Sequence, residues 1–283
     1  MIATLSKKDA LAYAQKIDLP ESTVSLLANG GLAFERIGEC AKGNLSMTAK
    51  RILALDCYKD DFNVQLETPE CIDYLISKDG LVGDGFFLMH NGADIGYCLV
   101  YPVKNERRKD LPADYSEVRR RANWGDISRY LSSALDAEGL GENNLYHHYD
   151  YAIKPLHMRG CGFGRLVLRY TLDLCLPKNC LSVGFVDYER HSASLTSASK
   201  AGCLMGQNVF PSPDGFHPSF LELYSKKMDI TFLGEEIAYA HKKDSFDLLP
   251  KAIHAVVDAE PKKKLVGFNH ALKRFEIVKA SLR

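Results

Sequence analysis

The residues best suited to chemistry form a glycine-rich turn at 159–165, which lies between an expected strand at 145–153 and an apolar-periodic helix. The turn reads Arg-Gly-Cys-Gly-Phe-Gly-Arg. A turn of this kind leaves successive backbone N–H groups without acceptors, and the positive end of the helix dipole lies behind them. The sequence therefore predicts an anion site, most naturally for a pyrophosphate.

The spacing of this turn separates three possible ligands. A P-loop requires lysine and then serine or threonine after its last glycine, but Gly164 is followed by Arg165 and Leu166, which excludes a P-loop. A dinucleotide fingerprint has G-x-G-x-x-G after a buried strand, whereas this strand carries two histidines and an aspartate, and the glycines alternate. The third ligand is coenzyme A.

The string Arg159-x-x-Gly162-x-Gly164 has the Q/R-x-x-G-x-G/A form of the pyrophosphate loop in the GCN5-related N-acetyltransferase (GNAT) family. A second block, an expected strand at 181–186 and then residues 191–203, follows at a matching distance. Because the two blocks occur in order, the sequence resembles the GNAT family.

The second block matches the family's Asn-x-x-Ser-(x)5-Lys-x-Gly-Phe helix at Ser194, Lys200 and Gly202. Two positions depart from it, since His191 replaces the asparagine and Cys203 replaces the closing aromatic residue. Many members also carry a tyrosine in this helix that protonates the leaving thiolate. The corresponding residue here is Ala198.

The resemblance implies an α/β fold in which a mixed sheet, flanked by helices, is splayed between its fourth and fifth strands. We expect one acyltransferase domain over residues 31–226 with an insertion at 103–143. A helical arm at 1–30 and a helical extension at 227–283 would complete the chain. The implied reaction transfers an acetyl or other short acyl group from acetyl-CoA to an amine in a ternary complex.

The family's cofactor contacts correspond to a strand end, the glycine-rich turn and the second block. A backbone N–H near Ala152 or Ile153 would polarise the thioester carbonyl. The remaining residues implied to bind the cofactor are Arg159, Gly160, Cys161, Gly162, Phe163, Gly164, Arg165, His191 and Ser194.

The catalytic base is expected on the strand before the turn. In the protein-lysine branch a carboxylate lies about ten positions upstream of the Q/R. This count reaches Tyr149, and a one-residue uncertainty in register admits His148 and Asp150. Strand alternation places His148 and Asp150 on one face, which favours them as a relay to the amine over histidines that merely line the cleft. Tyr188 is the nearest phenol that could act as the acid, although a thiol with a pKa of about 8.5 leaves readily without one.

Two classes of function stay open. The first is an N-acyltransferase whose acceptor is a protein amine, favoured by the long insertion and extensions, or a small amine, which would call for an acidic pocket. The second is a non-catalytic acyl-CoA-binding module or sensor, favoured by the alanine at position 198.

The amino-acid composition limits the partners and the cellular compartment that we expect for this protein. The 283 residues are 46% hydrophobic, and 36 basic residues balance 36 acidic ones, so we expect neither nucleic-acid nor membrane partners. The first residues lack an apolar leader, and eight cysteines occur without a CxxC pair, which predicts a cytoplasmic protein. A protein exported through an uncleaved signal would look the same. The His147/His157 and Cys175/Cys180 spacings fit no common zinc pattern, so no metal is expected.

Local signals predict several further elements. Helices are expected after Ser6 and from Pro20, then a strand at 32–37 and a helix capped by Ser46. Other expected elements are a helix at 69–79, a tight hairpin at Asn91-Gly92, a helix from Asp126, strands at 204–210 and 219–224, and helices at 235–241, 247–257 and 269–278.

Overall fold

In a computed structural model the chain divides into two compact units, Met1–Arg120 with His147–Cys175, and Arg121–Tyr146 with Leu176–Arg283. Both units combine strands and helices, which confirms the α/β class. The division does not follow the boundaries expected at residues 30 and 226. The structure describes residues 2–3, 5–55, 83–103, 124–137, 139–187, 192–207, 219–237, 251–253, 255–256 and 265–282.

The strands of the first unit follow one another across its sheet in chain order. They are β1 (Ile2–Ala3), β2 (Leu32–Arg36), β3 (Asp84–His90), β4 (Ala93–Pro102) and most of β5 (Leu145–Ile153). Strands β1 to β4 pair antiparallel. Asn91 and Gly92 take the positive φ angles of a two-residue turn, 50° and 81°, which confirms the predicted hairpin.

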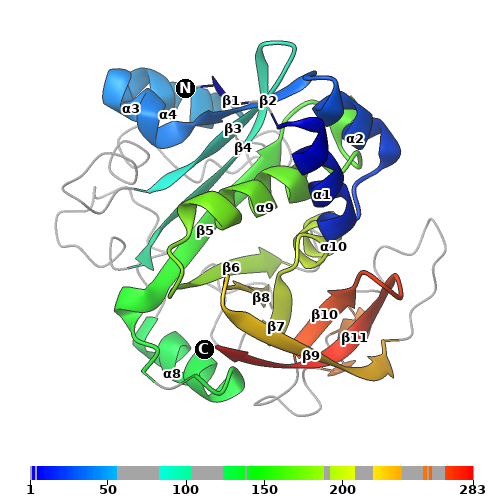
Figure 1. Cartoon of the computed structure of the whole chain (residues 1–283). Helices are drawn as coiled ribbons and strands as arrows, with labels where there is room; N and C mark the ends of the chain where they lie inside the picture. Colours follow the sequence, from blue (N-terminus) through cyan, green and yellow to red (C-terminus); the bar gives the residue numbers. More distant parts are fainter. Residues whose placement is uncertain are drawn as a thin grey trace. The chain divides into compact units, whose positions relative to one another are not determined.

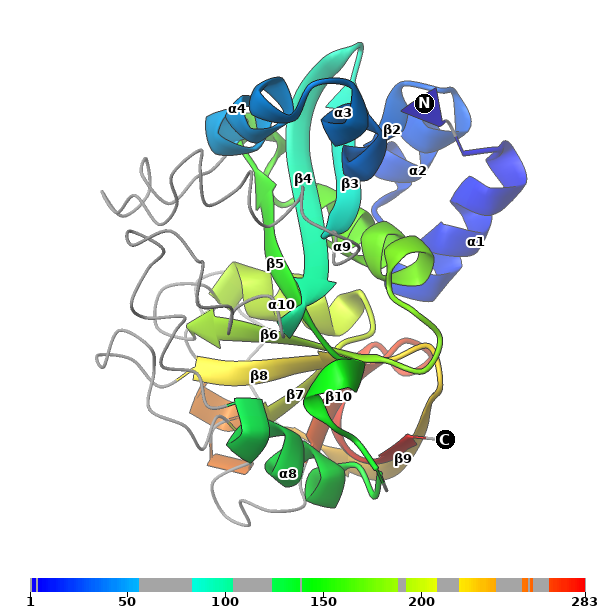
Figure 2. The ribbon, with the colours of Figure 1, turned by 90° about the vertical axis from the view of Figure 1, so that its left-hand side faces the viewer.

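Helices cover both faces of this sheet, as Figures 1 and 2 show. Helices α3 (Ile37–Gly43) and α4 (Leu45–Leu55) pack on one face. Helix α9 (Phe163–Cys175) covers the other, and α1 (Lys7–Ile17) packs against α9 and against α2 (Glu21–Ala28).

Strand alternation supplies a core residue to each face. Phe34 of β2 stacks on Tyr170 of α9 with ring centroids 3.9 Å apart, and Phe86 meets the same ring edge-on. The next residue, Phe87, points to the opposite face and packs with Ile52 of α4. The sheet of this unit is therefore buried on both sides.

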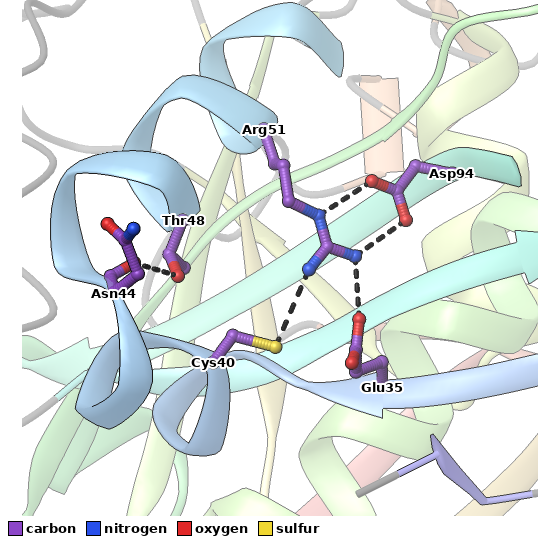
Figure 3. Close-up of polar contacts among 6 residues, drawn as sticks. All are labelled: Glu35, Cys40, Asn44, Thr48, Arg51 and Asp94. Atoms are coloured by element: carbon purple, nitrogen blue, oxygen red, sulfur yellow. Dashed lines mark hydrogen bonds and ion pairs between the residues drawn. The ribbon is translucent and has the colours of Figure 1, made fainter.

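Arg51 fastens α4 to the sheet (Figure 3). Its guanidinium bonds both carboxylate oxygens of Asp94 on β4 at 2.8 Å and a carboxylate oxygen of Glu35 on β2 at 2.7 Å. It also lies 4.0 Å from the ring centroid of Phe87. Cys40 receives a weaker contact from the same group, and burial raises the pKa of its thiol.

The N-terminal helices begin where the sequence predicts. The Ser6 side chain accepts the N–H of Asp9, and α2 begins after Pro20. For α4 the expected cap was wrong: Asn44, rather than Ser46, accepts the N–H of Met47 at 3.0 Å, because the helix starts one residue earlier than Ser46. The helix expected at 69–79 lies outside the described residues.

The second unit has the strand order β6-β8-β7-β10-β11-β9. Its strands are β6 (Leu181–Asp187), β7 (Leu204–Gln207), β8 (Ser219–Tyr224), β9 (Met228–Glu236), β10 (Leu265–Asn269) and β11 (Arg274–Leu282). Its helices include α8 (Trp124–Ala134), the short η2 (Glu142–Asn144) and α10 (Ser192–Lys200). No helix in the described ranges has the length and apolar character that a bilayer crossing requires.

The helical extension predicted at 227–283 is wrong over most of its described part. Residues 228–236 form a strand, and the expected helix at 269–278 is instead the turn and second strand of a hairpin. The apolar runs there are short, so helical and strand periodicities fit equally, and pairing with β7 and β9 decides between them. Residues 251–253 and 255–256 are helical, as predicted for 247–257.

Candidate functional site: the glycine-rich loop of the first unit

The candidate site begins at the end of β5, which lies beside β4. The N–H of Lys154 bonds the carbonyl of Ile95 at 3.0 Å, while the Tyr101 hydroxyl lies 3.0 Å from Nδ1 of His147. As the residue numbers rise along β4, the numbers of their partner residues on β5 fall, so the two strands are antiparallel. A Cβ on Gly96 would come within 2.4 Å of the Ala152 carbonyl, so this close approach requires glycine.

The register between these strands slips by one residue along β5. At one end, odd-numbered Tyr101 shares a face with odd-numbered His147. At the other end, odd-numbered Tyr97 shares its buried cluster with even-numbered Ala152. The alternation of side chains between the two faces of β5 therefore shifts by one residue between 147 and 152, as it does at a β-bulge.

The predicted relay of His148 and Asp150 lies in this same segment of β5. His147 and His148 are both buried. The side chain of Asp150, together with Tyr188 and His191, lies outside the described residues, so their predicted roles stay predictions.

The glycine-rich turn connects β5 to α9 through a short 3-10 turn, η3 (Leu156–Met158). Gly160 and Gly162 both have left-handed φ, 81° and 82°, a conformation that favours glycine. The Gly162 carbonyl accepts the N–H of Leu166, so Phe163, Gly164 and Arg165 form the first turn of α9. Their N–H groups have no acceptor within the helix. The turn therefore has the backbone geometry that an anion site requires, and the site itself stays a prediction.

The two arginines of the turn have different surroundings. Arg159 is exposed, and its Nε donates to the carbonyl of Ile153 at 3.0 Å, which ties the turn to the end of β5. Arg165 is 8% exposed, and its Nε is a buried donor without a hydrogen-bond partner. Burial lowers the pKa of this guanidinium, which the nearby carboxylate of Asp18 partly offsets. A buried cation of this kind favours an incoming anion.

The N-terminal arm also contacts the turn, which the sequence reasoning missed. The Thr23 hydroxyl donates to the Cys161 carbonyl at 2.5 Å. A Cβ on Gly162 would meet Pro20 Cδ and Arg165 Nε, each at 2.9 Å. The start of α2 was visible in the sequence, but no local signal identifies a contact with a turn so distant along the chain.

The second block forms α10 in the second unit, as expected. Ser194 is partly exposed, whereas Ala198, at the position of the missing tyrosine, is fully buried. Gly202 ends the helix with a φ of 96°. Lys200 lies 5.0 Å from the ring centroid of Phe268, a structural contact. The expected splay involves β5 and β6, which lie largely in different units, and it stays a prediction.

Within the described residues, His, Cys, Asp and Glu form no group of three or more that could hold a metal ion. The described cysteines are free thiols. Burial raises the pKa of the Cys180 thiol, which disfavours the thiolate that metal ligation requires.

No protein-family model matches the sequence, and no curated protein matches it significantly. Solved structures do. The chain's structural neighbours are GNAT acetyltransferases. Aminoglycoside acetyltransferase AAC(6')-Ib in complex with coenzyme A has 12% identity and a TM-score of 0.40, over 69% of this chain and 95% of that one.

Two further neighbours are other acetyltransferases. Arabidopsis thaliana NAA60 in complex with acetyl-CoA has 12% identity and a TM-score of 0.39, over 68% of this chain and 97% of its own. The ribosomal-protein-S18-alanine N-acetyltransferase from Escherichia coli has 10% identity and a TM-score of 0.36, over 62% and 86%. Likenesses at this level concern the fold alone.

Proposed function

We propose that this protein is an acyltransferase that moves an acetyl or short acyl group from coenzyme A to an amine. One observation carries the proposal: the N–H groups that begin α9 and the buried guanidinium of Arg165, whose Nε has no hydrogen-bond partner, lie together at a turn with two left-handed glycines. This combination suits a diphosphate, because it offers several donors and a positive charge to one doubly anionic group.

The residues present fit coenzyme A. The orphaned Nε of Arg165 would gain an acceptor from a phosphate oxygen. Gly162 has a left-handed φ and no room for a Cβ beside Pro20 and Arg165, so the turn requires glycine at this position. The remaining contacts to the diphosphate would come from Arg159, Gly160, Cys161, Phe163 and Gly164. His191 and Ser194 would lie along the pantetheine arm.

When bound, acetyl-CoA supplies the thioester. A backbone N–H near Ala152 or Ile153 would donate to the thioester oxygen and so stabilise the negative charge that develops there during attack. His148 and Asp150 would accept the proton of the attacking amine, and Tyr188 would protonate the departing thiolate. We favour an acceptor amine on a protein over a small amine, because the segment 103–143 is longer than the family's usual connection between the strands that flank it.

A non-catalytic acyl-CoA sensor is the second candidate. It is favoured by Ala198, which is fully buried and offers no proton in place of the usual phenol. Both candidates require coenzyme A to bind, and they differ in whether an amine accelerates thiol release.

The test measures coenzyme A binding by calorimetry and thiol release from acetyl-CoA with a panel of peptides and small amines. Gly162→Glu should abolish binding, because its side chain would collide with Pro20 and bring a negative charge to the turn. Gly43→Glu is the matched control, since a Cβ there meets nothing within 4 Å. Unchanged affinity in Gly162→Glu would contradict the proposal. Binding without amine-dependent release would support the sensor.

A further inference from the structure

The N-terminal arm follows α9 along its length and ends against the glycine-rich turn. Near the end of the helix, the Tyr13 hydroxyl and the Lys16 ammonium both bond Asp173, at 3.3 and 2.9 Å. Farther along the arm, Thr23 bonds the backbone of Cys161. The arm is therefore fixed against the whole helix, including the turn where an anion would bind.

Between these two attachments, the arm presents a carboxylate to the buried cation. Oδ2 of Asp18 lies 3.9 Å from Nη1 of Arg165. This separation is long for an ion pair, since charge-assisted N–H···O bonds measure about 2.7–2.9 Å. The guanidinium is thus neutralised weakly, and its Nε has no hydrogen-bond partner.

The backbone fixes the position of Asp18. It is the C-cap of α1 and adopts the left-handed conformation, with φ 54° and ψ 48°, and its N–H bonds the carbonyl of Ala14. Its side chain is 26% exposed, against 9% for Arg165. The Asp18 carboxylate therefore extends from a fixed backbone position beside the guanidinium.

We infer that Asp18 competes with the bound diphosphate for Arg165, so that the N-terminal arm sets the affinity of the turn for its ligand. The inference rests on the proposed function only for the identity of the ligand as coenzyme A. The carboxylate lowers the positive charge available to a phosphate and offers the guanidinium an internal alternative. Asp18 is therefore an affinity-determining residue that lies outside both sequence blocks.

The experiment compares Asp18→Asn with the wild-type protein by calorimetric titration of coenzyme A and, separately, of inorganic pyrophosphate. Asparagine tolerates the left-handed conformation, so the backbone should be kept, and a thermal melt checks it. Asp18→Gly is a second variant for the same purpose. Glu21→Gln is the matched control, because it removes one negative charge from the same arm three residues away.

Asp18→Asn and Asp18→Gly should bind both ligands about two- to fivefold more tightly, the range expected for loss of one partly exposed ion pair. Glu21→Gln should change affinity less than twofold, by roughly the long-range field alone. In an Arg165→Gln background, Asp18→Asn should have no further effect. Equal changes in affinity in Asp18→Asn and Glu21→Gln would overturn the inference. Weaker binding by Asp18→Asn than by the wild-type protein would also overturn it.

The two ligands separate this inference from the proposed function. If pyrophosphate binds and responds to Asp18→Asn while coenzyme A does not bind, the proposed function fails and the role of Asp18 stands. If both bind and Asp18→Asn has no effect, the role of Asp18 fails and the proposed function stands. If neither ligand binds the wild-type protein, both are overturned.

Discussion

At the scale of single residues, a cluster of charged side chains around Arg51 stabilises the first unit. Arg51 joins two strands through Glu35 and Asp94, and its guanidinium stacks on Phe87. Each of the three charged side chains is at most 25% exposed, so the carboxylates would be poorly solvated without their partner. This cluster contributes to stability and has no role in the proposed chemistry.

Replacing Arg51 should therefore destabilise the fold. Arg51→Met keeps an apolar cover over Phe87 and removes the partner of two carboxylates, so the free energy of unfolding should fall by about 1–3 kcal/mol. Urea denaturation measures the change. Lys42→Met is the control, because Lys42 pairs with Glu39 on the surface, where such pairs contribute little. Equal losses in the two variants would show that the Arg51 cluster is not special.

At the scale of elements, the β3–β4 hairpin provides a sharp prediction. A Cβ at Gly92 or at Gly43 would meet nothing within 4 Å, so neither position is crowded. The two glycines differ in backbone conformation, because Gly92 has a φ of 81° and Gly43 has no positive φ. Gly92→Ala should cost about 1–2 kcal/mol, because only the backbone conformation is unfavourable. Gly43→Ala, at the end of a helix and without positive φ, should be neutral or slightly stabilising. Urea denaturation of both variants checks this, and a neutral Gly92→Ala would contradict it.

Elements with a distinct local signal could be predicted from the sequence. The Asn91-Gly92 hairpin, β5 and the glycine-rich turn before α9 all occur where predicted. In each case the signal is local, since it depends on residues that demand a particular backbone conformation or on the alternation within one strand.

Long-range contacts could not be predicted in this way. The hairpin of β10 and β11 turns at Asn269, whose side chain accepts the N–H groups of Ala271 and Leu272, in a segment that also fits a helix. The register slip in β5 depends on its pairing with β4. The contacts of Asp18 and Thr23 with the turn join residues more than a hundred positions apart.

At the scale of the whole molecule, both units contain tyrosines whose ionisation is disfavoured. Burial raises the pKa of Tyr13 and Tyr170 in the first unit and of Tyr130 and Tyr146 in the second. For Tyr130 the pKa rises to about 12. An unfolded chain ionises its tyrosines near pH 10, so alkaline pH favours unfolding of both units.

The direction of this pH effect on stability follows from the protonation of Tyr130 in the folded and unfolded states. The folded protein retains the neutral phenol of Tyr130 up to a pKa of about 12, while the unfolded chain loses the proton near pH 10. The contribution of this group is complete below about pH 10 and is lost as pH rises towards 12. The free energy of unfolding of the wild-type protein should therefore fall over this range. Between pH 8 and pH 12 the free energy of unfolding of Tyr130→Phe should fall by about 1–2 kcal/mol less than that of the wild-type protein. Urea denaturation of both proteins at pH 8, 10 and 12 measures the difference. A constant difference across the range would mean that Tyr130 ionises equally in the folded and unfolded states.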